Sequence, residues 1–162
     1  MDADAPSGRA WVAYLRQELT APAAALAEYA TDLAAHAAAA DPDTSIAAAR
    51  VQDRAVHLLA AVERLTDPDS GFEPAGPPGM VEEQLRAVRH DLRAAAAYVV
   101  SACEDIAEGP AADRLGGDAA RTLTAARRVI DSIEAVVRFA RSDTAAPTEP
   151  VREMLARLDL PA

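Results

Sequence analysis

The chain of 162 residues contains no lysine and no asparagine, and it has one cysteine and only 4% aromatic residues. A single cysteine excludes a disulfide framework within the chain. No stretch approaches the 18 apolar residues of a membrane-spanning helix, and the acidic start, residues 1–4, lacks the apolar core of a secretory signal. We therefore expect a cytoplasmic protein with no membrane partner.

Positive charge is also scarce, because 16 basic residues face 26 acidic ones and the net charge is −10. Binding to phosphate backbones requires clustered cations, so this balance argues against a nucleic-acid partner and against anionic membrane surfaces. Neither His36 nor His57 has metal-ligand spacing to a second donor. We expect neither a metal nor a cofactor.

The chain is rich in helix-forming residues, and 51% of it is hydrophobic, much of that alanine. Proline and glycine divide it: a turn at 41–44, a linker at 67–79, and a break at Gly109 and Pro110. Thr44 or Ser45 is the expected cap of the second helix and Asp118 that of the fourth. The expected helices are 8–40, 45–66, 80–108 and 118–142.

Apolar residues recur every 3.5 positions in these helices. The first and third helices share their phase with a shift of 73 residues: Leu15, Leu19, Pro22, Leu26, Tyr29 and Leu33 against Val88, Leu92, Ala95, Val99, Ala102 and Ile106. The second helix has the row Val51, Ala55, Leu58, Val62 and Leu65, and the fourth has Leu123, Ala126, Ile130, Ile133, Val137 and Ala140.

This repetition predicts an all-α, pseudo-twofold four-helix bundle built from two tandem antiparallel hairpins, 1–66 and 80–142. Such a chain is a monomeric, intramolecular pseudo-dimer. A coiled-coil dimer of long helices fits less well, because the proline-rich breaks are too frequent. Trp11 is expected to pack at the end of the bundle.

The segment 143–162 is predicted to be a linker followed by a short amphipathic helix. One possibility is that the apolar side chains of this helix dock on the bundle: Met154, Leu155, Leu158 and Leu160. The other is that the segment leads into a further domain.

The candidate site lies in the third helix, in the run Val88-Arg89-His90-Asp91-Leu92-Arg93. The heptad phase turns His90 away from the bundle seam, where a bulky partner can reach it. A neutral imidazole nitrogen can attack phosphorus, and the adjacent Asp91 can hold the tautomer or take the proton. Arg89 and Arg93 can steady phosphoryl oxygens.

A degenerate copy of this run lies in the first helix, where Gln17 and Glu18 take the places of the histidine and its acid. The remaining histidines, His36 on the seam and His57 in the second helix, are expected to be structural. Cys103 is expected to be a buried thiol.

The run at His90 resembles the H-box of the dimerisation and phosphoacceptor domain of bacterial histidine kinases. That motif has a histidine, an acid, leucine, arginine, threonine and proline near the start of a long helix in a hairpin, and two such hairpins dimerise into a four-helix bundle. The run Gln17-Glu18-Leu19-Thr20-Ala21-Pro22 is similar to it as well. The resemblance implies that His90 is the phosphorylated residue and Asp91 its assisting acid.

Two departures from the motif limit what the resemblance implies. The position four residues after the histidine, which the family uses in phosphatase activity, is Ala94, and Ala95 replaces the proline; the matching position in the first copy is Ala21. The chain after residue 141 has no glycine and hence no glycine-rich nucleotide loop, so self-sufficient kinase activity is not expected.

These features predict a phosphotransfer module of two-component signalling, which exchanges phosphate between His90 and a receiver domain or receives it from a histidine kinase. The receiver would dock on the outer face of the third and fourth helices. Two alternatives remain: a non-catalytic docking or signal-relay scaffold, and a helical bundle in which the motif is fortuitous.

Overall fold

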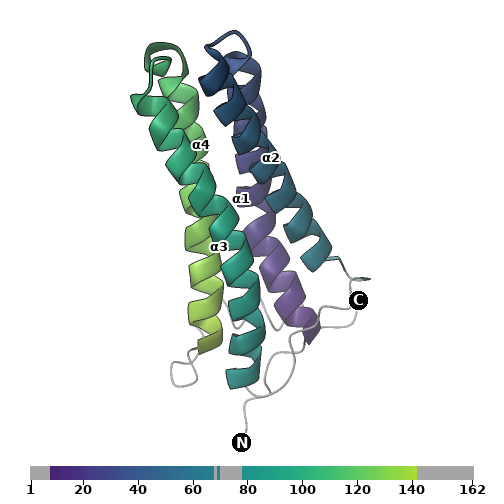
Figure 1. The fold of residues 1–162 in the computed structure, drawn as a ribbon. Helices are drawn as coiled ribbons and strands as arrows, with labels where there is room; N and C mark the ends of the chain where they lie inside the picture. The colour runs from purple at the N-terminus through teal and green to yellow at the C-terminus, as the bar shows by residue number, and fades with distance from the viewer. Residues whose placement is uncertain (1–7, 68, 70–77, 142–162) are drawn as a thin grey trace, which may run out of the picture.

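The computed structural model describes residues 8–67, 69 and 78–141, and these residues form four helices and no strand. The helices are α1 (Gly8–Ala37), α2 (Pro42–Leu65), α3 (Pro78–Glu108) and α4 (Ala112–Arg141). Two hairpins, α1–α2 and α3–α4, stand side by side with their turns at the same end (Figure 1). The structure confirms the four-helix bundle. The predicted helix at 151–160 and the side chain of Trp11 lie outside the described residues.

Each helix packs against two others: α1 against α2 and α4, and α3 against α4 and α2. The helices α1 and α3, which carry the two copies of the motif, therefore occupy opposite corners of the bundle. Surfaces that point outward from these two corners face different directions.

The core repeats between the hairpins. Five buried residues of α1 recur in α3 after 73 residues, each at most 5% exposed: Leu19, Ala23, Leu26, Ala30 and Leu33 with Leu92, Ala96, Val99, Cys103 and Ile106. Five of α2 recur in α4 after 71 residues: Ala48, Val51, Ala55, Leu58 and Val62 with Ala119, Thr122, Ala126, Val129 and Ile133. This matched burial supports the pseudo-twofold relation between the hairpins.

The expected rows are partly out of phase with this core. Pro22 and Ala95 are only half-buried, as are Tyr29 and Ala102, and the neighbouring small residues fill the interior. In α4, Leu123 and Ile130 were expected inside, but Thr122 and Val129 are fully buried. Thr122 tolerates burial because its Oγ1 donates to the Asp118 carbonyl at 2.8 Å.

The expected start of α2 was wrong, because Asp41 and not Thr44 or Ser45 caps the helix. The Asp41 carboxylate accepts from the Thr44 backbone N–H at 2.9 Å and from the Thr44 hydroxyl at 2.7 Å. These bonds lower the pKa of Asp41, chiefly through the backbone N–H of Thr44. Pro42 is tolerated because the first helical positions need no N–H donor.

The expected cap of α4 at Asp118 was also wrong, because α4 begins six residues earlier at Ala112. Gly116 and Gly117 lie inside the helix, each costing roughly 1 kcal/mol relative to alanine. Burial of Leu115, which is 1% exposed, favours the extra turn. Likewise α3 begins at Pro78, within the expected linker 67–79, and α1 ends at Ala37, three residues short of the expected 40.

Among the described residues, no helix combines the length and apolar character required to cross a membrane.

Candidate functional site

His90 lies on the outer surface of α3, as the heptad phase predicts, and its side chain is 84% exposed. Its Nδ1 atom lies 3.3 Å from Oδ1 of Asp91, which is itself 86% exposed. A carboxylate only accepts hydrogen bonds, so this contact places the imidazole hydrogen on Nδ1. In the neutral ring, a hydrogen on Nδ1 leaves the lone pair of Nε2 available for reaction.

Two arginines beside His90 share one carboxylate of the neighbouring helix. Arg89 Nε donates to Oε1 of Glu134 at 3.1 Å, and Arg93 Nη1 donates to the same oxygen at 3.0 Å. Sequence reasoning named both arginines but missed Glu134, because it lies 45 and 41 residues away on α4. The basic pair therefore already has an anionic partner.

The degenerate copy on α1 has a different arrangement. Gln17 is exposed and Glu18 is half-buried. Arg16, at the position of Arg89, donates to the carbonyl of Thr66, which follows the end of α2. Thr20 stands at the position of Arg93, so this corner has one arginine where α3 has two.

His57 on α2 resembles His90 in its local geometry, although the run of residues around it is different. Its side chain is 74% exposed, and its Nδ1 lies 3.3 Å from Oδ1 of Asp53. Its Nδ1 also lies 2.7 Å from the Asp53 carbonyl, which is an accepting oxygen. An exposed imidazole beside an acid is thus not unique to position 90. What distinguishes His90 is the pair of arginines held by Glu134.

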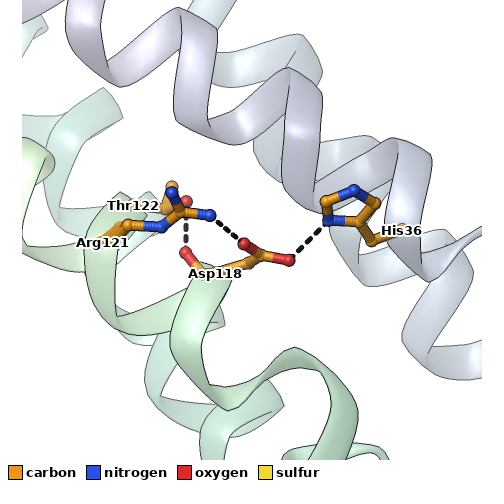
Figure 2. A network of polar contacts seen from close by, with 4 residues as sticks. All are labelled: His36, Asp118, Arg121 and Thr122. Carbon is orange, nitrogen blue, oxygen red and sulfur yellow. Dashed lines mark hydrogen bonds and ion pairs between the residues drawn. The ribbon is translucent and has the colours of Figure 1, made fainter.

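A second polar cluster, shown in Figure 2, joins α1 to α4. His36 Nδ1 lies 2.6 Å from Oδ2 of Asp118, and Arg121 donates to the other oxygen of the same carboxylate. The pKa of Asp118 is lowered, mainly by the hydrogen bond with His36 and further by Arg121. His36 was expected on the seam, but its side chain is 61% exposed and Ala37 takes the buried position.

This cluster borders a groove of about 580 Å³ between α1 and α4. Pro22, Tyr29 and Arg128 are among the residues that line it, and Arg121 also lies 5.6 Å from the centre of the Tyr29 ring. No histidine, cysteine or carboxylate is among the residues that line the groove, and the cluster ties the two hairpins together across α1 and α4.

Cys103 is fully buried in α3, as expected. Burial raises the pKa of its thiol to about 12, with a smaller contribution from Glu104, so the reactive thiolate is disfavoured. Within the part of the chain that the structure describes, no group of three or more His, Cys, Asp or Glu residues is placed to hold a metal ion.

Comparisons of the chain with protein-family models, with curated proteins and with solved structures find no match.

Proposed function

We propose that this bundle is a phosphoacceptor module that exchanges a phosphoryl group between His90 and an aspartate of a receiver domain. The observation that carries the proposal is the arrangement of His90: an exposed imidazole whose Nδ1 faces Asp91, with two arginines beside it. The resemblance to the H-box supports the same assignment. The module would act in the cytoplasm as a monomeric pseudo-dimer.

With the hydrogen of the His90 ring on Nδ1, the nitrogen that accepts the phosphoryl group is Nε2. The Nε2 lone pair of His90 attacks the phosphorus of the receiver's aspartyl phosphate, and the bond from phosphorus to the carboxylate oxygen breaks. The electron pair leaves with the receiver's carboxylate, and the ring becomes positively charged. Asp91, 3.3 Å from Nδ1, stabilises that charge while the Nδ1 hydrogen stays in place.

The receiver would dock on the outer face of α3 and α4. This face presents His90 and Arg93, and both side chains are more than half exposed. Asp91 adds an acid that orients the ring. Because His90 projects from the surface, a rigid receiver can bring its aspartate to the imidazole without any opening of the bundle.

The test is incubation of the full chain with a phosphorylated receiver, followed by phosphorus NMR and mass-spectrometric mapping. We expect an acid-labile, base-stable phosphohistidine at position 90, which His90→Gln abolishes. His57→Gln is the matched control, since His57 has a similar exposure and the same 3.3 Å distance to an aspartate. This variant should retain full labelling.

A small donor such as phosphoramidate gives a second arm, because it transfers a phosphoryl group to imidazole and releases ammonia. Intrinsic reactivity alone would label His57 and His90 alike, whereas recognition by a receiver would label only His90. Labelling that survives His90→Gln, or that falls equally with His57→Gln, would contradict the proposal.

One observation favours a second candidate, a docking or signal-relay scaffold without phosphate chemistry. Ala94, an exposed alanine, presents a methyl group where the H-box has the hydroxyl of a threonine. A scaffold would bind the receiver equally well after His90→Gln and remain unlabelled in the wild type. Pull-down of the receiver together with the labelling assay separates the two functions.

A further inference from the structure

We propose that Arg93 is the phosphoryl-binding residue of this site and that Glu134 holds it in reserve until His90 is phosphorylated. The proposal rests on the proposed function, because it concerns the regulation of the same site. It assigns a role to Glu134, a residue of α4 outside the H-box-like run. Glu134 is a positioning residue here, since it acts only through the arginine.

The two arginines differ in how tightly the bundle holds them. The side chains of Arg89 and Glu134 are 26% and 29% exposed, whereas that of Arg93 is 52% exposed. Arg89 and Glu134 thus form the fixed part of the cluster. Arg93 is the member that can exchange its partner for one in solvent.

Helix geometry places Arg93 within reach of a phosphoryl group on His90. The two residues are three positions apart on α3, and side chains at this spacing are neighbours on a helix surface, with their Cβ atoms about 5–6 Å apart. Both side chains are mostly exposed. A rotation of the Arg93 side chain therefore carries its guanidinium from Glu134 to the phosphoryl oxygens without any backbone movement.

The charges favour this exchange only after phosphorylation. One carboxylate faces two guanidinium groups, so these three side chains together carry one positive charge. A phosphoryl group offers three oxygens and more negative charge than a carboxylate, and guanidinium binds such oxygens in a bidentate way. Before phosphorylation, Glu134 competes for Arg93 and keeps it away from other anions.

The chain supplies a matched control for Glu134. Arg127 donates to Glu104 at 3.2 Å, and this ion pair also joins α3 to α4, with side chains 59% and 50% exposed. It lies more than two helical turns along α3 from His90. Glu104→Gln thus removes an ion pair between the same two helices without touching the candidate site.

The experiment measures the equilibrium ratio of phosphohistidine to receiver aspartyl phosphate in the full chain. Glu134→Gln keeps the shape of the side chain and removes its charge, so it should raise the ratio about two- to fivefold, the range of exposed ion pairs. Arg93→Ala should lower the ratio by a similar factor, and Glu104→Gln should leave it unchanged.

The decisive arm is the double variant Glu134→Gln with Arg93→Ala. If Glu134 acts through Arg93, the gain from Glu134→Gln disappears when Arg93 is absent, and the double variant matches Arg93→Ala alone. A purely structural effect of Glu134 would persist in the double variant. Denaturant unfolding of Glu134→Gln and Glu104→Gln checks that both variants are folded.

Three results would overturn the proposal: an unchanged ratio in Arg93→Ala, an unchanged or lower ratio in Glu134→Gln, or a gain that persists in the double variant. In each of these cases His90 is still labelled, so the proposed function survives. Absence of any label on wild-type His90 is a different result, and it would overturn the proposed function and this inference together.

Discussion

In α1, Arg16, Gln17 and Glu18 occupy the positions that Arg89, His90 and Asp91 occupy in α3. The residues beneath them are closely matched, because Leu19 and Leu92 are both buried at equivalent places. The residues around them differ. The α3 copy ties two arginines to Glu134, whereas the α1 copy ties one arginine to the end of α2.

The acid that binds the arginine pair in the second hairpin has a counterpart in the first. Glu63 lies 71 residues before Glu134, the same shift that relates the cores of α2 and α4. Glu63 is exposed, and Arg16 donates instead to the Thr66 carbonyl. The two hairpins thus share the same pattern of buried residues, whereas the exposed residues of α1 and α3 make different polar contacts. The packing of the core does not determine which side chains these surfaces carry.

The largest expected effect tests the shared interior. Leu19→Ala and Leu92→Ala should each lower the free energy of unfolding by about 2–5 kcal/mol, because each leaves a cavity in a close-packed core. Urea titration followed by circular dichroism measures both. If the hairpins are equivalent, the two losses should be of similar size, because both leucines are almost fully buried at matching places. A clearly smaller loss in one hairpin would break the comparison.

The next largest expected effect tests whether an exposed histidine alone is sufficient for phosphoryl labelling. Gln17→His in the His90→Gln background restores an imidazole on α1, but Thr20 stands where α3 has Arg93. We expect labelling by a phosphorylated receiver to remain at least about tenfold below wild type, because acceptor and oxygen-binding groups must be positioned together. Adding Thr20→Arg should recover part of the loss. Full labelling by Gln17→His alone would show that the surroundings of His90 are unimportant.

Much of the shared interior was predictable from the sequence, and much of the difference between the surfaces was not. The proline and glycine breaks give the number of helices, the 73-residue repeat predicts the two hairpins, and the 3.5-residue spacing predicts the outward position of His90. It does not fix how far one helix is shifted along another. The contact of Arg93 with Glu134 depends on that shift, as does the contact of His36 with Asp118 across 82 residues.

The helix starts were mispredicted for a local reason. Thr44 and Asp118 both have side chains that can cap a helix, and a sequence pattern cannot tell which of several nearby candidates does so. In α2 the cap is Asp41, one residue before Pro42. In α4 the expected start at residue 118 left Gly116 and Gly117 outside the helix, yet an added Cβ at either glycine would meet nothing within 4 Å, and the helix passes through both.

A smaller expected effect, on the pH dependence of stability, distinguishes the two interfaces between the hairpins, α1 with α4 and α2 with α3. The pair of His36 and Asp118 ties α1 to α4, and the residue of α2 that matches Asp118 is Ala47. The pKa of Asp118 is lowered in the folded protein, chiefly by His36, so the unfolded chain takes up the proton first as the pH falls. The stabilisation is therefore complete above about pH 5 and decreases progressively as the pH falls below about 4, the ordinary pKa of an aspartate.

The stability gap between wild type and Asp118→Asn should follow this titration. We expect the gap in the free energy of unfolding to be constant from about pH 5 to 6 and to shrink from about pH 4 downward. Asp53→Asn, which removes an exposed pair with His57 inside one helix, is the control and should change stability little. A gap that stays constant through the acid range would contradict the assigned role of Asp118.

The smallest expected effect concerns Arg16, whose contact replaces the one that Arg89 makes with Glu134. The Thr66 backbone N–H and hydroxyl both donate to the Val62 carbonyl, at 3.0 and 2.8 Å, and Arg16 binds the Thr66 carbonyl beyond them. A cation at a helix C-terminus stabilises the last turn. Arg16→Ala should therefore lower the free energy of unfolding by less than about 1 kcal/mol, but amide hydrogen exchange in the last turn of α2 should rise several-fold. Arg89→Ala should leave exchange in that turn unchanged. Equal exchange in both variants would show that the Arg16 contact does not stabilise the last turn of α2.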